Sequence, residues 1–406
     1  MDGALHLVND DTGKEVFNFI PKEVLKRQGQ AFMPGGTFTQ SEGIPYGVDG
    51  PWTVYSVLSN GLSNIEAKQV LTFGGLRMGG SNYYGLDLTS YRSPRLVYNV
   101  GSTYSDNVDS TGTLLSDISA STTSNGGSGP NFSRMGQTWG KPSVGFVTID
   151  GRRTMVNFLP GGYDVCYEDP EFKLNSDGPG GSLVGTTCDN KSRAQGSAVY
   201  MVGVGTSEVD AQTDNVKKIN LNSTKKGSLL WSTDEGLLHS VVSEIRVLDR
   251  NNDGLSDHLY FSDLGGSVYR VDINNDKNTD FSASDPVKVL DASGAATGSD
   301  APPRFYERPL VTFVRLDDSR QVVATVTVGS GDRSSPLYDD REVANRLYTV
   351  IDKDIARADM FVYDNPATTT DEASILDRSE LLSQNLKPVD FGGNTGATKL
   401  LELKFN

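Results

Sequence analysis

The sequence predicts an all-β protein built from short strands and many turns. Of its 406 residues, 44 are glycine and 17 are proline, and only 36% are hydrophobic. Turns need glycine and proline, whereas both residues are disfavoured inside helices. The chain has no stretch of about 18 consecutive apolar residues, so we expect no transmembrane segment in it. Because an all-β protein of this length can form one unit, we expect a single domain over residues 1–406.

A strand–turn–strand unit recurs along the chain. In each copy a β-rich run ends at Gly or Gly-Gly, and a second strand follows. The copies cover residues 69–76 with 83–88, 153–162 with 197–204, 258–266 with 267–273, and 321–329 with 346–352. Repeated units with glycines and aromatic residues at such offsets are typical of a β-propeller. The uneven spacing of the units predicts a modified propeller with long loop insertions.

The two ends of the chain are predicted to be strands as well. Residues 5–10 (LHLVND) and 15–20 (EVFNFI) are joined by the turn Asp-Thr-Gly, and residues 399–405 (KLLELKF) form a final strand. We expect the two ends to complete one blade together, because closure removes exposed sheet edges. Residues 101–135 are rich in Ser, Thr, Gly and Asn, which predicts a surface loop. Residues 370–384 have a cap-like Thr-Asp start and helical spacing of apolar residues, which predicts a short helix near the C-terminus.

Charge and cysteine content narrow the functional classes. The net charge of −15 argues against nucleic acid as a partner, because phosphate binding needs a basic surface. Cys166 and Cys188 are the only cysteines, which is too few for a zinc site. They flank a glycine-rich segment, and a disulfide that closed this segment would favour an exported protein. Two buried free thiols are the alternative.

Residues 249–257 (DRNNDGLSD) are the most chemically specific stretch of the chain. Oxygen donors stand at alternate positions, as in the loop with which an EF-hand wraps one Ca²⁺, and Gly254 follows where such a loop turns sharply. The usual Glu at the twelfth position is replaced by Tyr260. The predicted calcium ligands are Asp249, Asn251, Asp253, Leu255 through its backbone carbonyl, and Asp257. A solvated turn between strands is the alternative interpretation, because Asp and Asn favour turns.

Other candidate sites are weaker. A second alternating run has Lys277 where glycine is needed, so we interpret it as a solvated turn, with a second calcium site as the alternative; its residues are Asp272, Asn274, Asp276, Asn278 and Asp280. Asp117, Ser119 and Ser121 match a known metal-site pattern, but they lie in a Ser/Thr/Gly tract and are interpreted as a chance match. The three histidines are far apart in the sequence, and no catalytic motif is present, so we do not expect an enzyme. We expect the aromatic residues to pack in the core rather than to stack on a ligand; the residues considered are Tyr83, Tyr84, Trp139 and Trp231.

Several segments appear in the order known from one protein family. They are DGALHLVNDDTGKEVFNFIPKEVL, VDGPWTVYSV, LTFGGLRMGGSNYYGLDLT, MGQTWGKPSVGFV, DRNNDGLSDHLYFSDLGGSVYRVDI, ERPLVTFV, VTVGSGDR and RLYTVID. In this order they resemble the C-terminal domain of the PilC/PilY family of type IV pilus tip-associated adhesin and biogenesis proteins. The most diagnostic segment is the calcium loop followed by Asp-Leu-Gly-Gly and an aromatic-Arg strand. Tyr269 and Val271 stand where family members often carry Trp and Phe.

The resemblance implies a propeller, seven-bladed, on an exported protein at the cell surface, the pilus tip or the outer membrane. It implies a role in pilus extension, surface display, adhesion, twitching motility and virulence, with bound Ca²⁺ regulating extension against retraction. The implied partners are minor pilins, a host or surface receptor and the protein's own N-terminal domain. The first residues, MDGALHLVND, lack a signal peptide, so we expect the chain to be a fragment of a larger protein.

Two other functional classes remain open from the sequence. A quinoprotein-type dehydrogenase is one, because residues 10–16 give one weak copy of the Asp-x-x-Thr-Gly-x-x-x-Trp motif of those propellers, without its Trp. A glycan-binding lectin is the other, and it overlaps with a role in adhesion.

Overall fold

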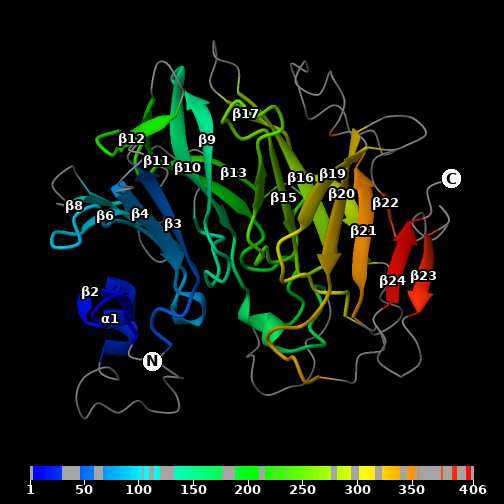
Figure 1. Ribbon diagram of the computed structural model, residues 1–406. Coiled ribbons are helices and arrows are strands. Elements are labelled where there is room, and N and C mark those ends of the chain that lie inside the picture. Colours follow the sequence, from blue (N-terminus) through cyan, green and yellow to red (C-terminus); the bar gives the residue numbers. More distant parts are fainter. Residues whose placement is uncertain are drawn as a thin grey trace, which may run out of the picture. The chain divides into compact units, whose positions relative to one another are not determined.

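The computed structural model is all-β, as the sequence predicted (Figure 1). It describes residues 3–29, 46–58, 67–102, 105–108, 114–118, 132–175, 188–209, 215–223, 225–234, 236–275, 281–293, 301–315, 322–338, 345–352, 355, 376–377, 386–390 and 399–403. The chain divides into two compact units. Unit 1 comprises Met1–Gly162 and Val199–Ser232, and unit 2 comprises Tyr163–Ala198 and Thr233–Asn406. That these units form one domain stays a prediction.

Unit 1 contains a hairpin, a short helix and two larger antiparallel sheets. The hairpin and helix are β1 (Leu5–Val8), β2 (Glu15–Phe19) and α1 (Lys22–Gln28). The first sheet, in order, is β3 (Trp52–Leu58), β4 (Ala67–Gly75), β5 (Asn82–Asp87), β6 (Arg95–Gly101), β7 (Ser105–Val108) and β8 (Leu114–Ile118), with the 3₁₀ helix η3 (Arg77–Gly79) between β4 and β5. The second is β12 (Val216–Asn220), β11 (Val199–Val209), β10 (Arg152–Pro160) and β9 (Ser143–Ile149), and β13 (Leu229–Thr233) also pairs with β11.

The described residues of unit 2 form three sheets. The first, in order, is β14 (Arg246–Leu248), β15 (His258–Ser262), β16 (Ser267–Asn274), β18 (Val287–Asp291) and β22 (Leu376–Asp377), and β17 (Ser282–Ala283) also pairs with β16. The second is β19 (Leu310–Arg315), β20 (Val322–Gly329) and β21 (Leu347–Asp352), which run side by side in Figure 1. The third is the hairpin β23 (Leu386–Asp390) and β24 (Lys399–Leu403), of which β24 packs beside β21. The 3₁₀ helix η4 (Val165–Glu168) follows Asp164.

The four predicted strand–turn–strand units are confirmed as antiparallel pairs. They correspond to β4 with β5, β10 with β11, β15 with β16, and β20 with β21. The N-terminal hairpin is confirmed too. In the described residues β1 pairs with β2 and β24 pairs with β23, and the joining of the two chain ends in one blade stays a prediction.

Two local predictions are corrected. The segment predicted as a surface loop at residues 101–135 contains β7 and β8, which extend the sheet beyond β6. Within the helix predicted at residues 370–384, only Leu376–Asp377 are described, and they form strand β22 beside β18. The rest of that segment lies outside the described residues. None of the helices in the described part of the chain is long and apolar enough to cross a membrane.

In the first sheet of unit 1, the backbone of Thr138 lies close to Gly75, the last residue of β4. A Cβ on Gly75 would lie 2.6 Å from the carbonyl oxygen of Thr138, so only glycine fits there. The Thr138 hydroxyl accepts a hydrogen bond from the Leu76 amide (2.8 Å) and donates to the Asn82 carbonyl (3.1 Å). One threonine thus joins the end of β4 to the start of β5. Of the aromatic residues expected in the core, Tyr83, Tyr84 and Trp139 are buried and Trp231 is half-buried.

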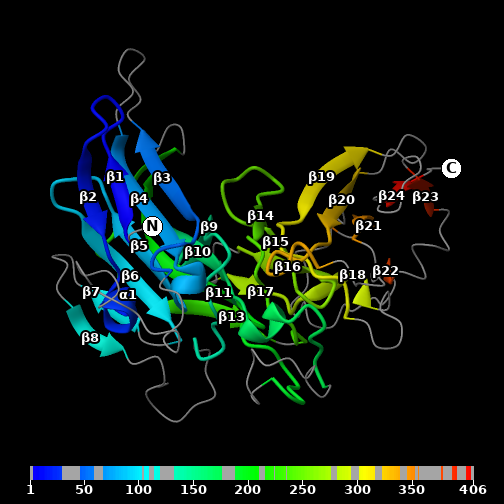
Figure 2. The same cartoon turned by 90° about the horizontal axis from the view of Figure 1, so that it is seen from below.

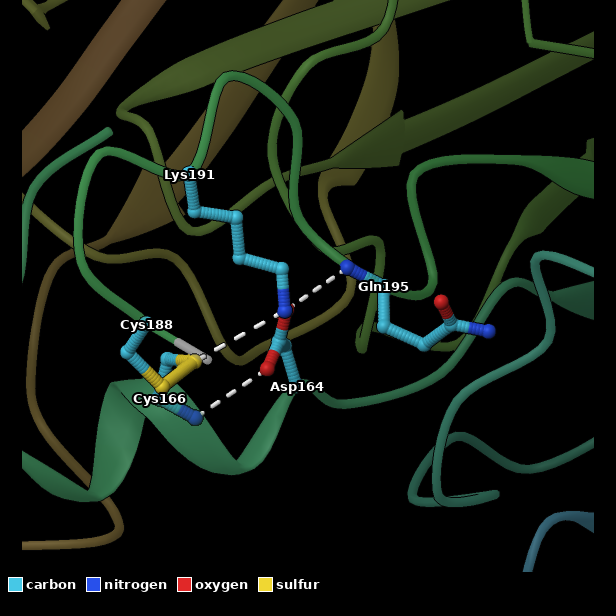
Figure 3. The surroundings of a disulfide bond; sticks show 5 residues. All are labelled: Asp164, Cys166, Cys188, Lys191 and Gln195. Atoms are coloured by element: carbon cyan, nitrogen blue, oxygen red, sulfur yellow. Dashed lines mark hydrogen bonds and ion pairs between the residues drawn. A yellow bond between two sulfur atoms is a disulfide. The ribbon is translucent and has the colours of Figure 1, made fainter. Parts of the chain in front are cut away.

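A disulfide between Cys166 and Cys188 is present, and both residues are buried (Figure 3). Asp164 lies at the centre of this region. Its carboxylate accepts hydrogen bonds from the amides of Cys166 (3.1 Å) and Gln195 (2.7 Å) and pairs with the Lys191 ammonium (2.6 Å). The alternative of two free thiols is therefore excluded, and the disulfide lies within a network that anchors both ends of the insertion.

Removing the disulfide should lower the stability of the chain. Its cysteines are 22 residues apart. A disulfide that closes a loop of this length lowers the conformational entropy of the unfolded chain, which raises the free energy of unfolding by about 3 kcal/mol. The variant Cys166→Ala/Cys188→Ala should therefore unfold at a lower urea concentration than the oxidised wild type. Reductant should shift the wild type toward the variant and leave the variant unchanged. An equal midpoint for oxidised wild type and variant would contradict the expected stabilisation.

Candidate functional site

The predicted calcium loop connects β14 to β15 in unit 2. Leu248, the last residue of β14, pairs with His258, the first residue of β15, so residues 249–257 form the loop of a hairpin (Figure 2). The Asp257 amide donates to the Leu248 carbonyl (2.8 Å), which closes the loop at its base. The predicted exit into a strand rather than a helix is thus confirmed.

The side chains at the start of the loop turn inward and accept hydrogen bonds from its own amides. The Asp249 carboxylate accepts from the amides of Asp253 (3.2 Å) and Gly254 (2.7 Å). The Asn251 side-chain oxygen accepts from the Asp253 amide (3.0 Å). Gly254 has a φ of 81°, in the left-handed region that favours glycine, so the turn expected at this residue is confirmed. Asp249, Asn251 and Asp253 are all exposed at the surface.

Asp257 differs from the other loop carboxylates because it is only 5% exposed. It accepts a hydrogen bond from the Arg250 amide (2.7 Å), across the loop. Burial raises the pKa of the Asp257 carboxyl above its usual value, and the negative charge of Asp253 raises it further, although hydrogen bonds from the loop amides oppose the shift. A carboxylate in such surroundings is one that a nearby cation would stabilise.

The residue types in the loop are those that a hard cation takes as ligands. Asp249, Asp253 and Asp257 bring three carboxylates into one nine-residue loop, and Asn251 and the Leu255 carbonyl are further oxygen donors of the kind that Ca²⁺ takes. Over the described ranges, no group of three or more Asp, Glu, His or Cys side chains is arranged as a metal site. The set would therefore depend on its amide and carbonyl oxygens as well as its carboxylates. The five ligands stay a prediction.

A buried network of charged side chains begins at His258, the residue that follows the loop. Arg270 on β16 donates from Nε to Asp272 (2.9 Å) and from a terminal nitrogen to both oxygens of Asp352 (2.7 and 2.6 Å). His258 hydrogen-bonds to Asp272 (2.7 Å), and the Tyr260 hydroxyl donates to Asp352 (2.7 Å). The network joins β15 and β16 of one sheet to the end of β21 in another.

Arg250 connects the loop to the far side of this network. Its guanidinium donates to the Ile355 carbonyl (2.6 Å), and the Ile355 amide donates to Asp352 (3.4 Å). The Arg250 amide also donates to Asp257, the residue before His258. The contacts therefore form a closed ring that runs from the loop to β15, then to β16 and the end of β21, and back to the loop through Ile355 and Arg250. Arg250 stands between two predicted ligands.

Sequence reasoning missed most of this network. Asp272 was interpreted as the first residue of a solvated turn, but it and Asn274 belong to strand β16, and Asp272 binds His258 and Arg270. Residues 276–280 of that run lie outside the described residues. Asp117 is in strand β8, while Ser119 and Ser121 also lie outside. The aromatic-Arg pattern before Asp272 was the available signal for a buried ion pair, but its partner Asp352 is 82 residues away from Arg270.

The chain is similar to a solved structure over most of its own length. No family model and no curated protein matches the chain. Among solved structures, the chain is similar to the crystal structure of the Pseudomonas aeruginosa PilY1 C-terminal domain, with 18% sequence identity and a TM-score of 0.47. The match covers 91% of this chain and 58% of that one, so this chain spans less than two thirds of the structure that it matches.

Breaking the buried network should destabilise the protein strongly. Arg270→Met would leave buried Asp352 and half-buried Asp272 without their cation, and the loss of one partner of a buried pair costs about 3–5 kcal/mol. Urea unfolding of the variant should show this loss. Arg308→Met is the matched control, because Arg308 is 42% exposed and pairs with Glu244 at the surface, where such a pair contributes about 1 kcal/mol or less. Equal losses in the two variants would refute a special role for the buried network.

Proposed function

We propose that this chain is a calcium-binding, non-enzymatic part of a type IV pilus biogenesis factor and tip-associated adhesin. It would promote pilus extension and surface display against retraction, and support twitching motility and attachment. The observation that carries the proposal is the folded loop 249–257, whose inward-turned carboxylates include the buried Asp257. The ordered set of segments that resembles the PilC/PilY family supplies the biological context.

The fold that we propose for the whole domain is a seven-bladed β-propeller. Its support is the repeated antiparallel strand unit, which recurs in both units of the chain. Unit 2 adds a hydrophobic core that its first two sheets share, with Tyr260 and Leu290 from one sheet and Val326 and Val350 from the other. Sheets that pack face to face in this way are what neighbouring blades require.

Calcium would act on the loop through charge. The carboxylates of Asp249, Asp253 and Asp257 repel one another within one short loop, and a divalent cation turns this repulsion into attraction. Bound Ca²⁺ would therefore hold residues 249–257 in one conformation. Because Arg250 and His258 belong to the ring of contacts that ends at Asp352, order in the loop would pass to the end of β21. A change of local order at β21 is a signal that a partner could detect.

The proposed partners and location follow from the same resemblance. Minor pilins of the tip complex, a host or surface receptor and the protein's own N-terminal domain are the candidate partners. The location would be the cell surface, at the pilus tip or associated with the outer membrane. The net charge of −15 argues against nucleic acid as a partner, because phosphate binding needs a basic surface.

Calcium binding can be measured directly on the purified chain. Isothermal titration should show one Ca²⁺ bound with a Kd of about 10⁻⁶ to 10⁻³ M, because the loop lacks the Glu that the tightest EF-hand loops use. Asp253→Ala should weaken binding at least about tenfold, which is about 1.4 kcal/mol. Calcium should also slow amide exchange in β21 of the wild type and not in Asp253→Ala.

Asp285→Ala is the matched control for that titration. Asp285 is exposed like Asp253 but lies outside the loop, so its removal takes the same charge from the surface and should leave calcium affinity unchanged. Undiminished calcium binding in Asp253→Ala would contradict the assignment of Asp253 as a ligand. Calcium binding without slower amide exchange in β21 would contradict the proposed coupling between the loop and β21 but would still support the calcium site.

The cellular role requires the full-length protein. A deletion strain complemented with full-length protein that carries Asp253→Ala should show fewer surface pili and less twitching than one with Asp285→Ala, at equal protein level by immunoblot. The difference should disappear when retraction is disabled, because calcium is proposed to oppose retraction. If the Asp253→Ala strain assembled, retracted and attached like the control, the pilus function of the loop would be refuted.

A further inference from the structure

A polar depression of about 680 Å³ lies on the second sheet of unit 1. Its floor comes from β10, β11 and β12, which lie side by side in Figure 1. The turn between β9 and β10 and the residues after β12 form its rim. This volume lies within the range of about 300–1,000 Å³ that small-ligand sites occupy.

Strand register explains why polar side chains gather on this floor. Thr154 on β10 pairs with Thr206 on β11, and Thr206 pairs with Asn220 on β12, so the three side chains form one row on the same face of the sheet. Alternate residues of a strand share a face, which adds Arg152 and Glu208 beside this row. All five line the depression.

The opposite face of these strands packs into the interior. Ile219, which alternates with Asn220, is fully buried, and both its backbone groups are hydrogen-bonded by the side chain of Gln69 (2.7 and 2.9 Å). The back of the floor is therefore packed in the interior, and Gln69 hydrogen-bonds the outer edge of β12. A preformed polar surface of this kind loses little conformational entropy when a ligand binds.

The charges of the lining balance. Arg152 and Lys225 offset Asp150 and Glu208, and Lys225 already pairs with Asp150 (3.6 Å). A site with two cations and two carboxylates gives no net preference for an anion or a metal ion. None of the described lining residues is aromatic, so a flat aromatic ligand would find no stacking partner.

Apart from Ile149, the lining offers hydroxyl, amide and ionic groups to a ligand. Threonine and serine hydroxyls and asparagine amides both donate and accept hydrogen bonds, and so does each hydroxyl of a sugar. An apolar ligand would leave these groups desolvated without a partner. We infer that this depression is a binding site for a neutral, hydroxyl-rich ligand, namely a saccharide.

The saccharide site would act independently of the proposed calcium loop. The loop belongs to unit 2 and the depression to unit 1, and the two share no residue. An open, polar site without an aromatic platform binds one sugar weakly, with a Kd on the order of 1 mM. Useful attachment would then require many copies or an extended glycan.

The test is a glycan array probed with the purified chain, followed by saturation-transfer NMR titration of the best-bound oligosaccharide. Thr206→Val removes one hydroxyl from the floor while keeping the side-chain shape and strand preference. It should raise the Kd about fivefold, the expected effect of one lost hydrogen bond. Thr206→Val/Glu208→Ala should abolish detectable binding.

Thr312→Val is the matched control, because it makes the same change on an exposed strand position in unit 2 and should leave the Kd unchanged. Thermal unfolding of all variants verifies that each is folded. Binding that persists in the double variant, or no bound glycan on the array, would overturn the assignment. Binding that survives calcium chelation but is lost in Thr206→Val/Glu208→Ala would support the saccharide site even if the calcium proposal failed.

Discussion

Burial of the Arg270 guanidinium is the constraint on which unit 2 depends. Burial opposes its charge, but Asp272 and Asp352 outweigh this and raise the pKa of the guanidinium above its ordinary value. Both carboxylates must stay beside it, because an unpaired buried charge would be strongly destabilising. The pair therefore fixes the end of β21 against β16, and His258 brings the base of the loop into the same arrangement. The proposed calcium loop thus lies on a rigid support.

The loop itself is a region of competing charges on that support. Its exposed carboxylates accept hydrogen bonds from loop amides, which stabilise the turn only locally, while buried Asp257 belongs to the base. A cation at this position would join the exposed half of the loop to the buried half. This arrangement suits a regulatory element, because the surface part can change order without unfolding the core. On the polar face of the β9–β12 sheet, by contrast, the register of the paired strands places the polar side chains side by side.

Local predictions succeeded where the signal is contained in neighbouring residues. The strand–turn–strand units, the N-terminal hairpin and the turn at Gly254 all follow from spacing and turn chemistry, and they appear as predicted. Strands β7 and β8 were missed because they are short and lie in a Ser-, Thr-, Gly- and Asn-rich segment, and they become strands by pairing, β7 with β6 and β8 with β7. The position of Leu376–Asp377 beside β18 is likewise a tertiary contact that overrides helical spacing.

The sequence by itself determined the all-β class, the repeated units and the set of oxygen donors at residues 249–257, because each depends on the chemistry of adjacent positions. Only the tertiary structure decided that Cys166 bonds to Cys188, that Asp272 is a half-buried partner of His258 and Arg270 rather than a turn residue, and that Thr154, Thr206 and Asn220 form one row. The disulfide, the contact of Asp272 with His258 and the strand pairs join residues that are 14 to 52 positions apart. Their formation depends on register and packing, which spacing along the chain does not encode.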